Sequence, residues 1–371
     1  MKLSTAASPT STSGDSFVSK RLSSLDILRG FDLFLLLFFQ PVLFRLGRAL
    51  NLPWLNEVLY HFDHEVWVGF RFWDIIMPLF LFMAGASMPF SFAKYKDCPD
   101  KSAVYRKVLK RFVLLFFFGM IVQGNLLGLD PEHFYYYNNT LQAIAAGYVI
   151  AAFTLLNASF LTQIGVAMAL LVVYTVPMML FGDYTLEGNF AYKVDVLLMG
   201  RFQGDPTYTW IWSSLTFGVT VLLGTFAGHI MKEGKENRKR AVVRLFVAGV
   251  ALVLAGELWS LEMPIIKRIW TGSMTLVSGG YCFLLMALFY FVVDYKGWNK
   301  GLNWLKFYGM NSITAYILGE TINFRSIVQS VSYGLKPYLG NLYDTWLTFG
   351  NFLILFFILR WMFKHKIFLK I

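Results

Sequence analysis

The sequence has few charged residues. Of its 371 residues, 15% are charged, 57% are hydrophobic and 18% are aromatic. A typical soluble domain has about 25% charged and about 45 to 50% apolar residues. A chain this apolar stays dispersed only in lipid, so the composition excludes a disordered chain and disfavours a soluble enzyme. It predicts an all-α fold, that of a polytopic helical membrane protein.

The sequence also lacks the patterns of several other protein classes. The alternation of a transmembrane β-strand is missing, since uninterrupted apolar runs such as 33–39 and 353–359 lie within longer apolar stretches. Two cysteines, Cys98 and Cys282, are too few for a disulfide framework, and we expect both as thiols. No GxSxG, HExxH, Walker or GxGxxG motif is present, which removes support for hydrolases and NTPases of those families.

The apolar stretches that are present predict about ten transmembrane helices in one bundle. Each is about 18 to 23 residues long, enough to cross a hydrocarbon core of about 30 Å at about 1.5 Å per residue. They are expected at residues 26–46, 72–93, 109–128, 140–157, 160–181, 209–231, 241–261, 272–294, 302–321 and 343–363. Residues 1–20 are polar, without the apolar core of a signal peptide, and are expected to be a disordered cytoplasmic tail.

The basic residues are distributed unevenly between the two ends of these predicted helices. If the N-terminus is cytoplasmic, 24 of the 33 Lys and Arg fall on the cytoplasmic side and 9 on the outer side. This asymmetry follows the positive-inside rule, so we expect both termini in the cytoplasm and the chain in the inner (cytoplasmic) membrane of the cell. The net charge of +11 then reflects topology in a lipid bilayer, and we expect no nucleic-acid partner.

The loop between the first two predicted spans concentrates ionisable groups. It contains two of the five histidines, His61 and His64, with Asp63 beside them and Asp74 at the start of the next span. A histidine can exchange a proton near neutral pH, and a carboxylate behind one ring nitrogen raises its basicity; Asp63 and Asp74 are both candidates. Interfacial histidines are the structural alternative. A metal shared by His61 and His64 lacks a third well-spaced ligand, so we expect no metal.

Other polar residues lie inside apolar stretches. Asp26, Arg29 and Asp32 share one helical face, as an ion-pair ladder or as a site where Arg29 holds a cofactor phosphate. Asn311 and Ser312 follow a glycine and a methionine, a patch that allows close helix approach or a helix break facing a cavity. For most such residues the structural alternative is an interhelical hydrogen bond, worth about 1 kcal/mol.

Four segments in a fixed order carry a family resemblance. RLSSLDILRGFDLF (21–34) matches an R-x-x-S-x-D-x-x-R-G opening, and HEVWVGFRFWDIIMPLFLFMAGASMPFS (64–91) matches a long H-x-x-W-x-G run with spaced Asp, Pro, Phe and Gly. Weaker matches are KRIWTGSMTLVSGG (267–280) and FYGMNSITAYIL (307–318). Together they resemble the heparan-α-glucosaminide N-acetyltransferase family of transmembrane acetyltransferases, including its bacterial members.

The resemblance implies a reaction and its residues. It makes 21–371 a transmembrane acetyltransferase domain that takes acetyl from cytoplasmic acetyl-CoA, with no metal. The acetyl goes to the amine of a glucosamine-type sugar on the outer side, as in heparan sulfate. The family's catalytic histidine falls on His64, its second-span aspartate on Asp74, and a polar residue, often Asn, on Gln40.

Donor binding is expected at several further residues. The basic segments 106–111 and 238–244 are expected to attract the CoA phosphates. Together with the polar patches described above, this predicts donor-binding side chains at Arg29, Arg111, Asn311 and Ser312. His64 then acts either as a general base or as a nucleophile that carries the acetyl group, and the sequence leaves both open.

The sequence departs from the family pattern at two positions. Gln40 stands where the family often has Asn, and Ala143 stands where it often has Arg, in Leu141-Gln142-Ala143. The alternatives therefore include an O-acetyltransferase of a cell-envelope glycan and a scaffold that has lost activity. A sugar or solute transporter that uses the same polar interior is a further alternative. A homodimer is left open.

Overall fold

The structure, a computed structural model, describes residues 22–95 and 98–369, and these residues form helices and loops without a strand. The tail predicted at 1–20 lies outside the described residues. Cys98 and Cys282 are both free, as expected. The helices are α2 (Ser23–Phe34), α3 (Gln40–Leu50), α4 (Pro53–His61), α5 (Ile76–Ala86), α6 (Met88–Ser91), α7 (Ser102–Val122), α8 (Thr140–Asn157), α9 (Phe160–Leu180), α10 (Phe190–Met199), α11 (Ser214–Glu233), α12 (Arg238–Trp259), α13 (Gly272–Phe289), α14 (Leu305–Met310), α15 (Ser312–Thr321), α16 (Phe324–Ser332), α17 (Lys336–Leu339) and α18 (Tyr343–Lys364).

In the described part of the chain, eight helical segments are long and apolar enough to cross a membrane. They are Ser23–Leu50, Phe72–Ser91, Thr140–Asn157, Phe160–Leu180, Ser214–Glu233, Arg238–Trp259, Gly272–Tyr295 and Phe324–Lys364. The prediction of an all-α, polytopic helical membrane protein is therefore confirmed, and each of the eight segments overlaps one predicted span. The first is continuous because a π-helical turn (Leu35–Phe39) joins α2 to α3.

The remaining two predicted spans are helical but differ from the expectation. In place of 109–128, α7 begins at Ser102 and carries four basic residues between Arg106 and Arg111, so its first half is too charged for a lipid-crossing segment. In place of 302–321, the chain forms two short helices, α14 and α15, that are interrupted at Asn311. Neither half alone is long enough to span a bilayer.

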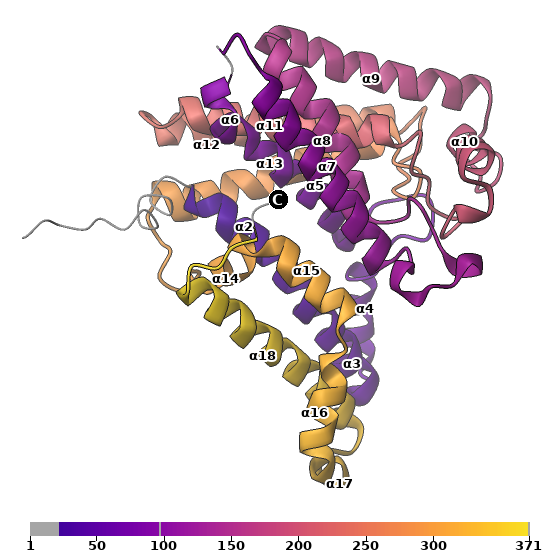
Figure 1. Ribbon diagram of the computed structural model, residues 1–371, viewed down its shortest axis with the longest axis vertical. Coiled ribbons are helices and arrows are strands. Elements are labelled where there is room, and N and C mark those ends of the chain that lie inside the picture. Colours follow the sequence, from indigo (N-terminus) through magenta and orange to yellow (C-terminus); the bar gives the residue numbers. More distant parts are fainter. Residues whose placement is uncertain (1–21, 96–97, 370–371) are drawn as a thin grey trace, which may run out of the picture.

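The helices form two groups that meet around α2 (Figure 1). In one group α11 packs against α5, α8 and α9, and α12 packs along α13. In the other, α2 packs against α14, and α18 packs against α14 and α16. Contacts of α2 with both α5 and α13 join the two groups. The helix α5 thus lies inside the bundle, and the site described below begins at its first turn.

The close approach of α5 and α11 depends on small residues. A Cβ atom at Gly224 on α11 would overlap the carbonyl oxygen of Phe82 on α5. Without a hydrophobic driving force between helices in lipid, such close contact supplies the van der Waals attraction that holds them together. This interface fixes α5 and, with it, the position of Asp74 just before it.

We predict that Gly224→Val lowers the thermal unfolding midpoint of the detergent-solubilised protein. Overpacking a closely packed interface costs about 1 to 3 kcal/mol. Gly165→Val on α9 is the matched control, because a Cβ there meets no atom within 4 Å. An unchanged midpoint for Gly224→Val would show that α11 can shift without cost.

Candidate active site

A buried carboxylate, that of Asp74, organises the loop between α4 and α5. Asp74 lies in the 3₁₀ turn η2 (Phe72–Ile75) directly before α5, and its side chain is 0% exposed. Its Oδ2 accepts hydrogen bonds from the backbone N–H groups of Arg71 (2.9 Å) and Glu65 (3.2 Å). These bonds satisfy one oxygen and fold the loop back over the helix start, where negative charge is favoured.

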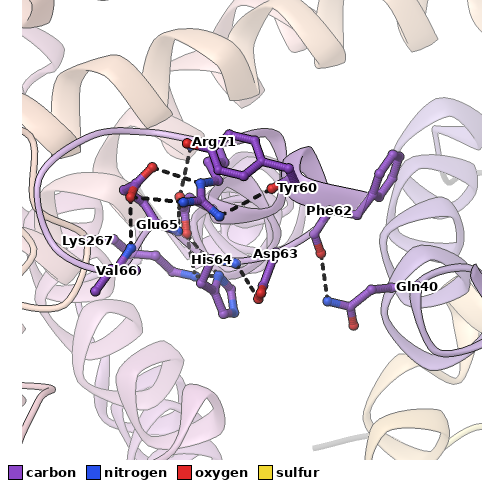
Figure 2. Close-up of polar contacts among 10 residues, drawn as sticks. Gln40, Tyr60, Phe62, Asp63, His64, Glu65, Val66, Arg71 and Lys267 are labelled. Carbon is purple, nitrogen blue, oxygen red and sulfur yellow. Dashed lines mark hydrogen bonds and ion pairs between the residues drawn. The ribbon is translucent and has the colours of Figure 1, made fainter. Parts of the chain in front are cut away.

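The other oxygen of Asp74 holds the two candidate reactive groups. Oδ1 lies 2.9 Å from Nδ1 of His64 and 3.3 Å from Nζ of Lys267. The lysine Nζ is in turn 2.8 Å from the same Nδ1 (Figure 2). The three polar atoms therefore form a triangle in which the carboxylate neutralises the ammonium. Asp63 instead accepts a hydrogen bond from the backbone N–H of His64 at 2.8 Å.

The triangle leaves the second ring nitrogen of His64 free to face the cavity described below. Its side chain is 38% exposed, whereas those of Asp74 and Lys267 are 0% and 6% exposed. No residue in the described ranges is hydrogen-bonded to Nε2 of His64. The imidazole is thus held at one nitrogen and accessible at the other, the arrangement that a base or nucleophile requires.

Further contacts hold the loop in place. Arg71 forms two hydrogen bonds to Glu65, at 2.8 and 3.1 Å, and its guanidinium lies 3.7 Å from the centre of the Tyr60 ring (Figure 2). The backbone N–H of Gly69 donates to the carbonyl oxygen of Ile265 at 2.8 Å, which joins this loop to the one that carries Lys267. Gly69 has φ +131, a conformation that a side chain would strain. The two loops are therefore fixed relative to each other.

The loop before α13 presents Lys267 to the triangle. The hydroxyl of Thr271 donates to the carbonyl oxygen of Pro264 at 2.9 Å and accepts from the backbone N–H of Ile266 at 3.1 Å. Trp270 adopts φ +51, and its indole N–H donates to the hydroxyl of Thr220 on α11 at 3.2 Å. A bulky residue holds this conformation only when its surroundings fix it. The turn therefore leaves Lys267 little freedom.

Burial and neighbouring charges shift the pKa values of both basic groups. Desolvation lowers the pKa of Lys267 to about 8, against the opposing attraction of Asp74. Desolvation also lowers the pKa of His64, and the positive charge of Lys267 adds to this, while the hydrogen bond to Asp74 opposes it. Near neutral pH the imidazole is therefore neutral and the lysine is within reach of titration.

His64 and Lys267 open onto a cavity of about 390 Å³. Its walls combine apolar and aromatic side chains with amides, a hydroxyl and carboxylates. They include Trp73, Phe80, Gln123, Asn138, Thr140, Asp205, Tyr208, Trp210, Tyr316 and Glu320. The cavity size and the mixture of aromatic and polar walls suit a small ligand such as a sugar ring.

One wall of the cavity is held by a second buried carboxylate. Asp195 on α10 is 0% exposed and accepts hydrogen bonds from the backbone N–H groups of Trp210 (2.7 Å) and Ile211 (3.0 Å). Desolvation raises its pKa to about 6. Asp195 thereby positions Trp210, whose ring packs against Tyr208 and Tyr137.

The third predicted catalytic residue, Gln40, lies beside the loop and outside the cavity wall. Its side-chain Nε2 donates to the carbonyl oxygen of Phe62 at 2.8 Å (Figure 2). The amide nitrogen is therefore used to hold the backbone two residues before His64. Placed there, Gln40 can orient the loop.

The four predicted donor-binding residues are not gathered at the His64 cavity. Arg29 pairs with Asp26 at 3.6 Å, and the guanidinium of Arg111 lies 4.3 Å from the ring centre of Tyr148. Asn311 and Ser312 lie at the break between α14 and α15. Asn311 is 2% exposed, and neither polar atom of its side chain has a hydrogen-bond partner in the part of the chain described.

Lys267 is the site residue that sequence reasoning missed. Its charge counts only among the nine cations on the predicted outer side, although it opens the segment KRIWTGSMTLVSGG that carries part of the resemblance. Its separation from His64 by 203 positions hid the contact. Among the residues described, no group of three His, Cys, Asp or Glu side chains could hold the metal considered for His61 and His64. The His61 ring lies edge-on against the Tyr60 ring.

Comparison with known proteins identifies the family of the chain. Residues 21–263 match the family described as heparan-alpha-glucosaminide N-acetyltransferase, catalytic. The match includes His64 and Asp74 and ends before Lys267. No curated protein matches the chain significantly. Because the family match covers more than half of the sequence, the chain belongs to the heparan-α-glucosaminide N-acetyltransferase catalytic family, a family of acetyltransferases.

Proposed function

We propose that this protein transfers acetyl from acetyl-CoA on the cytoplasmic side of a membrane to the amine of a glucosamine-type sugar on the other side. The observation that carries the proposal is the imidazole of His64, anchored at Nδ1 by a buried carboxylate and open to a cavity at Nε2. CoA carries several phosphate charges and cannot cross lipid, whereas an acetyl group is small and neutral. Only the acetyl group therefore needs to cross.

His64 performs the chemical step in one of two ways. As a general base, its Nε2 takes a proton from the acceptor as the acceptor nitrogen attacks the thioester carbon and the thiolate leaves. As a nucleophile, Nε2 forms a bond to the acetyl carbon and the thiolate leaves. The acceptor nitrogen then attacks the acetyl carbon, the bond to Nε2 breaks, and the departing imidazole takes the proton that the acceptor nitrogen loses. In both, Asp74 stabilises the positive charge that develops on the ring.

A second cavity is the proposed binding site for the phosphate-bearing end of the donor. It has a volume of about 250 Å³ and is lined by Ser23 and Asp26 on α2, Lys306 and Met310 on α14, and neighbouring side chains. Lys306 donates to the hydroxyl of Ser23 at 3.2 Å. Arg238, from one of the predicted phosphate-attracting segments, hydrogen-bonds Asp294, whose carboxylate accepts from the backbone N–H of Ser24. Lys306 in the cavity wall suits a phosphate-bearing ligand, and Arg238 is linked to the same end of α2 through Asp294.

Two stretches of the chain run from the second cavity to the His64 cavity. The first is helical from Asp26 to Leu36, and the second runs from Met310 across the helix break at Asn311 to Tyr316. The ten residues of the first stretch span about 15 Å, a large part of a bilayer core. Each stretch contains a buried polar side chain without a partner among the described residues, Asp32 on the first and Asn311 on the second. Unsatisfied buried polar groups are costly, and the amides of a pantetheine arm would satisfy them.

The cavity charges favour an amine acceptor over a hydroxyl acceptor. Asp74 is already paired with Lys267, whereas Asp205 and Glu320, which also line the cavity, form no ion pair with any described residue. Asp205 accepts hydrogen bonds from the backbone and hydroxyl of Thr207 through one oxygen only. Two carboxylates without a cation attract an ammonium group. This supports N-acetylation over the O-acetylation alternative.

We predict that His64→Ala reduces acetyl transfer from labelled acetyl-CoA to glucosamine by at least about 100-fold, the lower range for general acid–base catalysis. The purified protein is assayed by product mass and label. His61→Ala, three residues away and without a contact to the triangle, is the control and keeps its activity. Near-normal turnover of His64→Ala would remove this residue from the mechanism.

Asn311→Leu is expected to weaken equilibrium binding of CoA by about tenfold. Two lost hydrogen bonds of about 0.5 to 1.5 kcal/mol each account for this change. The thermal stability of the ligand-free protein should stay equal or rise, since an unsatisfied buried amide is removed.

Thr175→Val on α9 is the matched control for Asn311→Leu. Thr175 is also buried, and its hydroxyl has no partner in the described ranges, but it lies in a different helix. We expect unchanged CoA binding for this variant. Equal CoA affinity in wild type and Asn311→Leu would exclude Asn311 from the donor site.

Glu320→Gln should raise the KM for an amine acceptor by up to about fivefold while kcat changes little, because a partly exposed ion pair contributes up to about 1 kcal/mol. Steady-state kinetics with glucosamine at fixed acetyl-CoA measures the effect. Glu187→Gln, an exposed residue outside the cavity wall, serves as the control. An unchanged KM would argue that this carboxylate does not bind the acceptor.

A further inference from the structure

Nδ1 of His64 has two polar neighbours but can serve only one of them at a time. Toward Asp74 it must donate a proton, because a carboxylate only accepts. Toward a protonated Lys267 it must accept one, because an ammonium only donates. The two cases correspond to the two tautomers of a neutral imidazole, and they place opposite groups, N–H or a bare lone pair, at Nε2.

Lys267 lies as close to Nδ1 as Asp74 does. Nζ of Lys267 is 2.8 Å from Nδ1 and Oδ1 of Asp74 is 2.9 Å from it, whereas Nζ is 3.3 Å from Oδ1. If Nδ1 carried a proton beside a charged ammonium at 2.8 Å, two donors would face each other. The charged lysine therefore selects the tautomer with hydrogen on Nε2, which can donate a hydrogen bond into the cavity but cannot accept a proton there.

We propose that Lys267 is a positioning residue that controls the tautomer of His64, so that loss of the ammonium proton exposes a bare Nε2 to the cavity. This inference rests on the proposed function for its purpose but not for its geometry. It assigns a role to a residue 203 positions from the histidine, beyond the segment matched by the family.

The proton balance of the change is simple. The ammonium of Lys267 passes a proton across 2.8 Å to Nδ1, and the proton on Nε2 leaves to water in the cavity. One proton is released in total, no other bond is formed or broken, and the lysine becomes a neutral amine. Nδ1–H then donates to Asp74 at 2.9 Å. The resulting imidazole has a free electron pair on Nε2.

The charged groups around the triangle make this change accessible. Lys267 faces the carboxylate of Asp74 and the ring of His64, and Arg268 adds a positive charge beside it. Asp63 adds a negative charge near His64. Burial outweighs the attraction of Asp74 and lowers the pKa of Lys267 to about 8. The reactivity of Nε2 should therefore depend on pH as the deprotonation of Lys267 does, and not as the deprotonation of an ordinary histidine does.

Carbethoxylation by diethyl pyrocarbonate tests this inference without any substrate. The bare nitrogen of an imidazole attacks the reagent, and site-resolved mass spectrometry gives the modification rate of His64 in the purified full-length protein between pH 6 and 9. We expect the rate to rise with a midpoint near pH 8, so that at pH 7 it is about one tenth of its plateau. His61, exposed at the end of α4, is the internal reference, and its modification rate should be the same in the wild type and in the Lys267 variants.

Two variants separate tautomer control from a structural role. Lys267→Arg keeps a permanent positive charge, so His64 should stay slow through pH 9. Lys267→Met removes the donor, and the midpoint of His64 should fall below that of the wild type. Thermal unfolding of both variants confirms that they are folded. If Lys267→Arg does not fold, Lys267→Met alone still decides the question.

Two outcomes would overturn the inference. One is a wild-type rate that already reaches its plateau at pH 7, which would mean that Nε2 is bare while the lysine is charged. The other is an unchanged midpoint in Lys267→Met. If the expected midpoints are found in a protein that transfers no acetyl group, the proposed function fails and the tautomer control stands.

Discussion

The site depends on a single buried carboxylate. Asp74 has no exposed surface, and each of its oxygens serves two partners, two backbone N–H groups on one side and His64 and Lys267 on the other. A buried carboxylate is tolerated only when it is paired and hydrogen-bonded in this way. The same contacts fold the loop, hold the imidazole and bring in a lysine that is 203 positions away in the sequence. One carboxylate therefore both folds the loop and positions the two candidate reactive groups.

The loop that carries His64 is held between a neighbouring loop and the cavity. The loop 62–71 bonds to the segment before α13 through Gly69 and borders the cavity at His64. Close packing of α5 against α11 keeps the carboxylate in register with both. The proposed transfer from a donor on one side of the membrane to an acceptor on the other requires a path through the helices. Asp32 and Asn311, the buried polar side chains proposed to line it, have no partners in the described structure.

Most of the membrane-spanning helices could be predicted from the sequence, because hydropathy and charge decide which segments can cross a bilayer. Eight spans follow directly from long apolar runs. The predicted and observed helices differ at α7 and at α14–α15, where basic residues or a helix break interrupt such a run. His64 and Asp74 were predicted together because they lie ten positions apart in one motif. Lys267 and Glu320 could not be placed, since their proximity to His64 or its cavity is created by tertiary packing alone. A catalytic role of Gln40 stays a prediction, and the hydrogen bond that its side chain makes is to the backbone of the loop.

The most direct test of a transmembrane acetyl transfer uses proteoliposomes with the two substrates in separate compartments. Acetyl-CoA is supplied on the side of the N-terminus and glucosamine on the opposite side, with orientation verified by protease accessibility. Our account predicts N-acetylglucosamine in the acceptor compartment and free CoA in the donor compartment, in equal amounts. Product formation only when both substrates share one compartment would contradict it.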